Sequence, residues 1–125
     1  MCIRDRDWVY EEFKDTSNYQ YIGFGTAESK MGGYIWGLTV TQPDKIQKMI
    51  AQTGSQFEDR KEVKSSLVIG ESIPAQMVTV TTNKYPDWIS KTIYFEHKGK
   101  LYVIGNGAVQ DDRFATFYNS FEFSN

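Results

Sequence analysis

The stretch TIYFEHKGKLYVIGNGAVQDDRFATFYNSFEF, from Thr92 to Phe123, decides the fold of this chain. Thr92–His97 and Lys100–Gly105 are rich in β-branched and aromatic residues, which suit a packed strand surface. Lys98-Gly99 between them predicts a two-residue hairpin turn of type I′, which needs positive φ at both positions. Both strands carry apolar side chains on both faces, so we expect the hairpin to be covered on both sides.

An amphipathic helix is expected to follow the hairpin and to end the stretch. Gln110 or Asp111 can cap its start, and Asp112 adds negative charge near the positive end of the helix dipole. The apolar residues fall at i, i+3, i+4 and i+7 and form an aromatic ridge, which consists of Phe114, Phe117, Tyr118 and Phe121. We expect this aromatic ridge to be buried against the hairpin, where each large side chain contributes about 1.5–3 kcal/mol.

The rest of the chain supplies further strands and one more helix. The helix is expected over residues 44–59, with Thr41 as its N-cap and Gly54 ending or bending it. Strands are expected at 7–13, 19–24, 34–41, 60–66 and 74–82, of which 60–66 is charged and reads as an exposed edge strand. In the strand 74–82, Val78 and Val80 are expected on one face and Met77 on the other. This order predicts an α+β fold with an antiparallel sheet of about six to seven strands flanked by helices.

Length and composition limit the classes of function. The chain has 125 residues, which is enough for one domain with a real core. A formal net charge of −2 and the absence of a basic run argue against a nucleic-acid surface. No apolar run in the sequence approaches the roughly 20 residues that a membrane helix needs.

The first six residues, Met1–Arg6, read as the translation of a transposon-end adapter used in sequencing libraries rather than as native protein. We therefore expect residues 7–125 to form the domain, with the true N-terminus missing. This exclusion also removes Cys2, which is the only cysteine. The expected domain then has no disulfide, no thiolate chemistry and no cysteine metal site.

Several turn and packing residues resemble the PsbP-like family, which is named after an extrinsic subunit of photosystem II. Asp7-Trp8 look like the end of its opening strand, and Gly99-Lys100 with Tyr102 look like its hairpin signal. Ser120–Phe123 resembles the end of its closing helix. The resemblance implies an α/β/α sandwich whose first strand is missing here. It also implies an extracytoplasmic bacterial lipoprotein, tethered to a membrane only through a lost N-terminal anchor.

Photosystem subunits of that family are associated with calcium, manganese or zinc, but this chain has no matching cluster of histidine and carboxylates. His97 is the only histidine, so it alone could serve a catalytic triad, and we expect it to be structural or exposed. Negative charge near a helix N-terminus explains the pair Asp111-Asp112. The remaining acidic pairs are interpreted as solvated charges, and they are Glu58-Asp59 and Glu11-Glu12. Gly23-Phe24-Gly25 lacks the third glycine of a phosphate-binding loop. We predict no catalytic residue, no metal ligand and no cofactor.

The loop Asn83–Ser90, NKYPDWIS, is the most promising surface. Tyr85, Asp87 and Trp88 are the candidate binding residues, because rigid aromatic side chains on a loop suit recognition of a partner or a sugar. The alternative is that Tyr85 and Trp88 fold back onto the core as a lid. Trp36 is expected to lie in the core.

These observations favour a non-enzymatic interaction or scaffold domain with a protein partner. The alternative is a module of the same fold that binds a small ligand or a metal such as calcium or zinc. A small hydrolase is a third hypothesis, and the lack of a recognisable nucleophile and base disfavours it.

Overall fold

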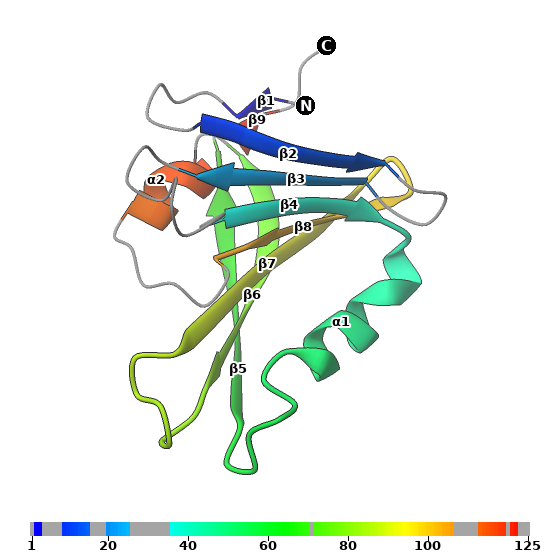
Figure 1. Ribbon diagram of the computed structural model, residues 1–125. Coiled ribbons are helices and arrows are strands. Elements are labelled where there is room, and N and C mark those ends of the chain that lie inside the picture. Colours follow the sequence, from blue (N-terminus) through cyan, green and yellow to red (C-terminus); the bar gives the residue numbers. More distant parts are fainter. Residues whose placement is uncertain are drawn as a thin grey trace.

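Figure 1 shows the computed structural model, which describes residues 2–3, 9–15, 20–25, 36–70, 72–106, 113–119 and 121–122. In the strands before residue 36 the backbone alone is described. A strongly twisted antiparallel sheet dominates the structure, and its strands turn from horizontal to nearly vertical in Figure 1. The prediction of an α+β fold built on an antiparallel sheet is confirmed.

The strands of this sheet lie side by side in an order that differs from their order in the sequence. From one edge to the other they are β2 (Val9–Asp15), β3 (Gln20–Gly25), β4 (Trp36–Thr41), β8 (Lys100–Gly105), β7 (Ile89–His97), β6 (Ile73–Thr81) and β5 (Lys61–Ile69). The five strands from β4 to β5 in this order are described with their side chains. A separate two-stranded sheet pairs β1 (Cys2–Ile3) with β9 (Phe121–Glu122), near both termini in Figure 1.

The hairpin of β7 and β8 forms with the expected turn. Lys98 has a φ of 51° and Gly99 a φ of 78°, so both central residues adopt the positive φ of a type I′ turn. His97 pairs with Lys100 directly before and after the turn. The first strand is longer than predicted and begins at Ile89 rather than at Thr92.

Side chains alternate along each strand, so the sheet has two distinct faces. On one face, the α2 face, the helix α2 (Arg113–Asn119) packs on the sheet. The buried cluster there consists of Trp36, Leu38, Ile69, Ala75, Ile93, Phe95, Ile104, Phe114, Phe117 and Phe121. On the other face, the α1 face, the helix α1 (Ile46–Gln52) covers a smaller buried cluster of Ile50, Val78 and Val80.

The three phenylalanines of the aromatic ridge are buried as predicted and Tyr118 is half-buried, but the closing helix is shorter than its spacing indicated. Phe114, Phe117 and Phe121 are 4%, 0% and 1% exposed, and the rings of Trp36 and Phe117 stack 4.8 Å apart. The helix ends at Asn119, so the prediction that Phe121 belongs to it was wrong. Phe121 lies in β9, which pairs with β1, and its side chain still reaches the core. The expected caps at residues 110–112 lie outside the described residues.

The first helix also differs from its prediction. Thr41 is the last residue of β4 and does not cap it. A 3-10 turn, η2 (Pro43–Lys45), leads into α1 and has no side-chain cap. The helix ends at Gln52 rather than at residue 59, because Thr53 is already extended and Gly54 adopts a φ of 69°. The prediction that Gly54 would end the helix is therefore confirmed.

Two further strand predictions are confirmed. β5 forms an edge of the sheet, and its residues from Lys61 to Ser66 are all exposed. In β6, Val78 and Val80 face α1, while Met77 packs against the cluster on the α2 face. Beyond β8, the buried Asn106 accepts a hydrogen bond from the backbone N–H of Lys91 at 3.0 Å and donates one to the carbonyl of Ile89 at 3.0 Å, which holds the chain against β7.

Candidate functional site

The candidate site lies where two connections meet at the lower end of the molecule in Figure 1. One is the segment 53–60 between α1 and β5, and the other is the segment 82–88 between β6 and β7. Within the second segment, the backbone N–H of Trp88 donates to the carbonyl of Tyr85 at 3.0 Å. Pro86 at the second position favours this turn, because its ring fixes φ near the required value.

A carboxylate from the first segment holds the second segment in place. Asp59 accepts a hydrogen bond from the hydroxyl of Thr82 and another from the backbone N–H of Asn83 at 2.7 Å. The hydroxyl of Thr82 also accepts the backbone N–H of Lys84 at 3.2 Å. The Thr82 hydroxyl, followed by the Asn83 amide, lowers the pKa of Asp59 from its ordinary value. These hydrogen bonds fix the backbone at the start of the segment 82–88.

Three aromatic rings join the two segments. The ring of Phe57 lies 4.9 Å from that of Trp88, edge to face, and 5.6 Å from that of Tyr85. Trp88 also packs against the buried cluster under α1. Directly beneath it, a Cβ at Gly54 would come within 3.0 Å of the indole, so only glycine fits there without displacing the ring.

The three predicted binding residues have different environments. Trp88 folds back as a lid on the α1 face, which was the alternative left open from the sequence. Tyr85 is 52% exposed although it contacts Phe57, and the ammonium of Lys84 lies 5.8 Å from its ring centre. Asp87 is exposed. The outward part of the site is thus an aromatic ring flanked by one cation and one carboxylate.

Sequence reasoning missed the residues that support this loop. The sequence places Phe57 within the helix expected over residues 44–59 and Asp59 in a solvated charge pair, and it connects neither with the loop. The signal available was Gly54, because a helix that ends there leaves Phe57 to pack elsewhere. No pattern in the sequence connects Asp59 with Thr82, which lies 23 positions further along the chain.

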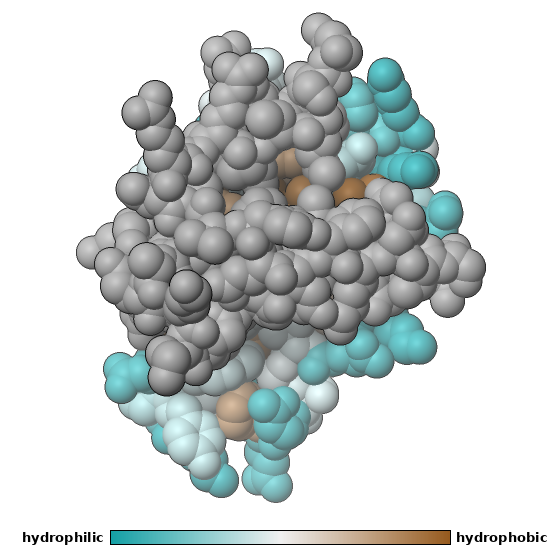
Figure 2. Space-filling model, turned by 45° about the horizontal axis from the view of Figure 1, so that its top comes forward, coloured by the Kyte–Doolittle hydropathy of each residue, from teal (hydrophilic) through white to brown (hydrophobic). Residues whose placement is uncertain are grey.

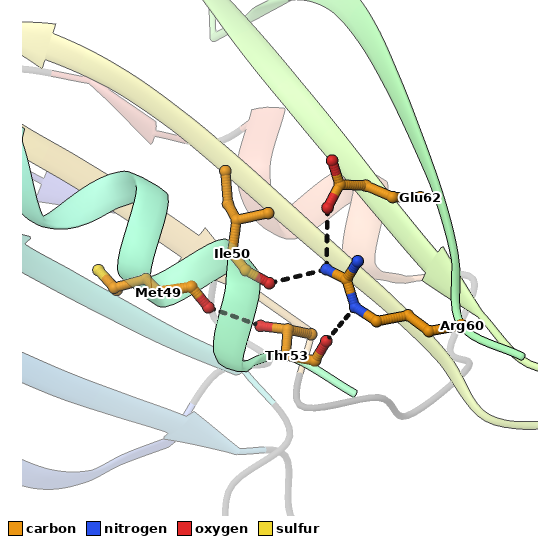
Figure 3. A network of polar contacts seen from close by, with 5 residues as sticks. All are labelled: Met49, Ile50, Thr53, Arg60 and Glu62. Carbon is orange, nitrogen blue, oxygen red and sulfur yellow. Dashed lines mark hydrogen bonds and ion pairs between the residues drawn. The ribbon is translucent and has the colours of Figure 1, made fainter. Parts of the chain in front are cut away.

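A second polar network fixes the segment 53–60 to the end of α1 (Figure 3). The guanidinium of Arg60 donates to the carbonyl of Thr53 at 2.7 Å and to that of Ile50 at 2.8 Å. The same side chain pairs with Glu62 at 2.9 Å. Carbonyls at a helix C-terminus lack intrahelical partners and carry partial negative charge, so a guanidinium is a fitting cap.

The other candidate residues do not converge on a site. His97 ends β7 with its ring 6.3 Å from that of Tyr102, edge to face, and is half-buried. Gly23-Phe24-Gly25 lies in the extended strand β3 rather than in a loop. Asp111-Asp112 lies outside the described residues. In the part of the chain that the structure describes, no three histidine, cysteine or carboxylate side chains are grouped for a metal ion.

A groove of about 240 Å³ lies on the α1 face, beside the first residue of α1. Ile46 and Leu101 supply apolar walls, while Gln76, Tyr94 and Glu96 supply polar groups. Gln76 exchanges hydrogen bonds with the hydroxyl of Ser66 on the neighbouring strand, at 3.1 and 3.3 Å. Ligand pockets for drug-sized molecules start at roughly 300 Å³, so the groove suits a small molecule or a single side chain.

Exposed apolar surface is limited in the described part of the chain. Its exposed large apolar side chains are Val63, Val68 and Tyr85. In Figure 2 the described residues at the lower end of the view are mainly hydrophilic with one small hydrophobic area, and further hydrophobic atoms are visible between the grey ones in the upper half. None of the helices in the described ranges has the length and apolar character of a membrane span.

Comparison with models of protein families, with curated proteins and with solved structures gave no match for this chain.

Proposed function

We propose that this chain is a non-enzymatic protein-interaction domain that contacts its partner through the tip of the segment 82–88. The observation that carries the proposal is that Tyr85 is 52% exposed on a loop whose backbone is held by Asp59 and by the ring of Phe57. An ordered loop loses little conformational entropy on binding, so the exposed ring can contribute most of its contact energy to affinity. Tyrosine is also among the residue types enriched at binding hot spots.

The flanking charges support a polar peptide or protein surface as the partner. Lys84 precedes the tyrosine and Asp87 follows it in the chain, both are exposed, and charged residues around an aromatic anchor are typical of the rim of protein interfaces. Trp88 contributes indirectly, because its packing against Val80 and Phe57 fixes the direction of the turn.

Selection of peptides from a random displayed library tests this function without knowledge of the natural partner. We expect enriched peptides to bind the wild-type chain and to lose at least about tenfold in affinity on the Tyr85→Ser variant. Lys98→Ser, at the hairpin turn of β7 and β8, is the matched control and should bind the same peptides as the wild type. No enrichment, or peptides that ignore Tyr85, would overturn the proposal.

The architecture supports a PsbP-like α/β/α sandwich as the finer description of the fold. The clusters under α1 and α2 lie on opposite faces of the antiparallel sheet, as that arrangement requires. We further propose an extracytoplasmic, membrane-tethered location, which rests on the resemblance of the opening and closing segments alone. Recovery of the upstream reading frame tests this: a basic and apolar stretch that ends in cysteine supports tethering, and an ordinary cytosolic start contradicts it.

The groove beside α1 favours a second candidate, a module that binds a small ligand. A ligand-observed NMR screen with small amphipathic molecules tests it. Hits should weaken on Gln76→Ala, which changes the groove, and persist on Tyr85→Ser, which changes the loop. For the metal version of this candidate, calcium or zinc at 100 times its Kd should raise the free energy of unfolding by about 2.7 kcal/mol. An unchanged melting temperature would rule that version out.

A further inference from the structure

The edge strand β5 leaves a long row of backbone groups available for pairing. Of the strands that the structure describes, only β6 pairs with it. Six consecutive residues, Lys61 to Ser66, are exposed, which means that both faces of this half of the strand are open. Val63 and Val68 are 62% and 59% exposed. Valine is β-branched, and such side chains favour strand pairing.

The two edges of the sheet differ in their suitability for pairing. β2, at the opposite edge, has a shift in register between Tyr10 and Glu12, which is the sign of a β-bulge. Bulges twist an edge and discourage further strands from adding to it. β5 pairs with β6 over nine consecutive residues without any shift, so its outer side is regular.

The charges on β5 are complementary to a second copy of the same strand. When two such strands run antiparallel about a two-fold axis at Val63, Glu62 of each copy lies opposite Lys64 of the other. The two valines then meet at the axis on the opposite face. Opposite charges directly across a strand pair stabilise it, while like charges destabilise it. Arg60 uses only Oε1 of Glu62, so Oε2 remains able to accept the lysine.

Lysines on an edge strand commonly prevent association, and Lys61 and Lys64 taken alone would fit that role. Glu62 changes the outcome, because it lies two residues before Lys64 on the same face. In the antiparallel pair, Lys64 of the second strand therefore neutralises Glu62 of the first, and Glu62 of the second neutralises Lys64 of the first. We propose that β5 pairs with β5 of a second copy, antiparallel and centred on Val63, to form a symmetric dimer with a continuous sheet. This inference goes beyond the proposed function and does not depend on Tyr85.

Sedimentation velocity of the wild-type chain, from low micromolar to near-millimolar concentration, is the first measurement. We expect a reversible monomer–dimer equilibrium, because the paired segment is short and the interface small. A wild-type chain that stays monomeric over the whole range overturns the proposal and leaves β5 as an edge for another protein or for none.

Charge reversal tests the pairing directly. Lys64→Glu and Glu62→Lys each place like charges opposite one another twice in the dimer, so each variant alone should show a dissociation constant at least about tenfold higher. A mixture of the two variants should form a heterodimer, since one strand is then doubly positive and the other doubly negative. Failure of the mixture to associate would contradict the register.

Two valine variants provide a matched pair of controls. Val63→Lys brings two ammonium groups together at the axis and should weaken the dimer, whereas Val68→Lys lies outside the paired segment and should leave it intact. Equal weakening by both variants would refute the axis at Val63. Tyr85→Ser should dimerise like the wild type, which separates failure of this inference from failure of the proposed function. Circular dichroism of every variant verifies that these exposed substitutions preserve the fold.

Discussion

Among the side chains that the structure describes, ten buried ones form one continuous cluster on the α2 face of the sheet, whereas the buried cluster on the α1 face contains three. The larger cluster includes Trp36 and four phenylalanines. The rings of Trp36, Phe114 and Phe117 stack on one another, and Phe95 meets Phe121 edge to face. The smaller one is supplemented by polar contacts, in which Arg60 and Asp59 tie distant backbone segments together. Apolar burial thus dominates the α2 face, whereas the α1 face, which also buries Leu101 and Val103, adds hydrogen bonds that position its loops.

This difference shows how the chain can present a fixed binding loop on a modest core. A carboxylate or guanidinium that bonds to several backbone groups specifies the direction of a loop more narrowly than apolar contact does. Four pairs of substitutions would break or sharpen the contrast between the faces.

The largest effect is expected for Phe117→Ala on the α2 face. Phe117 is fully buried and stacks on Trp36, so truncation should lower the free energy of unfolding by about 3–5 kcal/mol. Ile50→Ala, its counterpart on the α1 face, should cost about 2 kcal/mol, at the lower end of the range for such changes. Denaturant unfolding measures both. If Ile50→Ala lowered the free energy of unfolding more than Phe117→Ala, the main core would lie on the α1 face instead.

Gly70→Ala tests how tightly the turn after β5 packs on the α2 side. Gly70 has a φ of 57°, and a Cβ there would lie 2.4 Å from the carbonyl oxygen of Phe121. Backbone strain and the clash should together cost about 3 kcal/mol. Gly99→Ala is the control, since its φ of 78° is also positive but nothing lies within 4 Å of the added Cβ. Comparable losses at both glycines would mean that the contact with Phe121 contributes nothing.

On the α1 face, Arg60→Ala should lower the free energy of unfolding by about 1–2 kcal/mol, because two carbonyls at the end of α1 lose a charged donor. Glu62→Gln removes only the partly exposed ion pair and should change stability by less than about 0.5 kcal/mol. Thermal unfolding at low ionic strength compares the two. If Glu62→Gln matched Arg60→Ala, the ion pair rather than the helix cap would be the stabilising contact.

The smallest effect is expected for Asp59→Ala, and it should depend on pH. The hydroxyl of Thr82 and the amide of Asn83 lower the pKa of Asp59 in the folded chain below its ordinary value of 3.8. A lowered pKa means that the carboxylate stabilises the fold at pH values above 3.8 and loses this contribution as the pH falls through the folded-state pKa. Unfolding curves of wild type and variant should therefore differ at neutral pH and converge in acid.

Thr82→Val removes the first donor to Asp59 and is the control for that experiment. Its stability should depend less steeply on pH than that of the wild type in the acidic range. A difference between wild type and Asp59→Ala that is constant from neutral to acidic pH would exclude the carboxylate as its cause.

Some parts of the candidate site could be predicted from the sequence and others could not. NKYPDWIS has the composition of a turn with two large aromatic residues, so the loop and its candidate residues Tyr85, Asp87 and Trp88 were found from local chemistry. Which of the two faces inward depends on distant segments, because the glycine at position 54 leaves space for the indole of Trp88, which packs against the cluster under α1. Nothing local to the loop encodes that space.

Sequence alone determined the alternation of faces in β6, the type I′ turn at Lys98-Gly99, the exposed edge at β5 and the burial of the aromatic ridge. Each of these follows from the chemistry of neighbouring residues, because strand and helix periodicities assign side chains to faces. The tertiary structure alone decided that Phe121 belongs to a strand and that Asp59 reaches Thr82. Those outcomes depend on contacts between segments far apart in the chain, whose distances are set by the twist of the sheet and by the lengths of its connections.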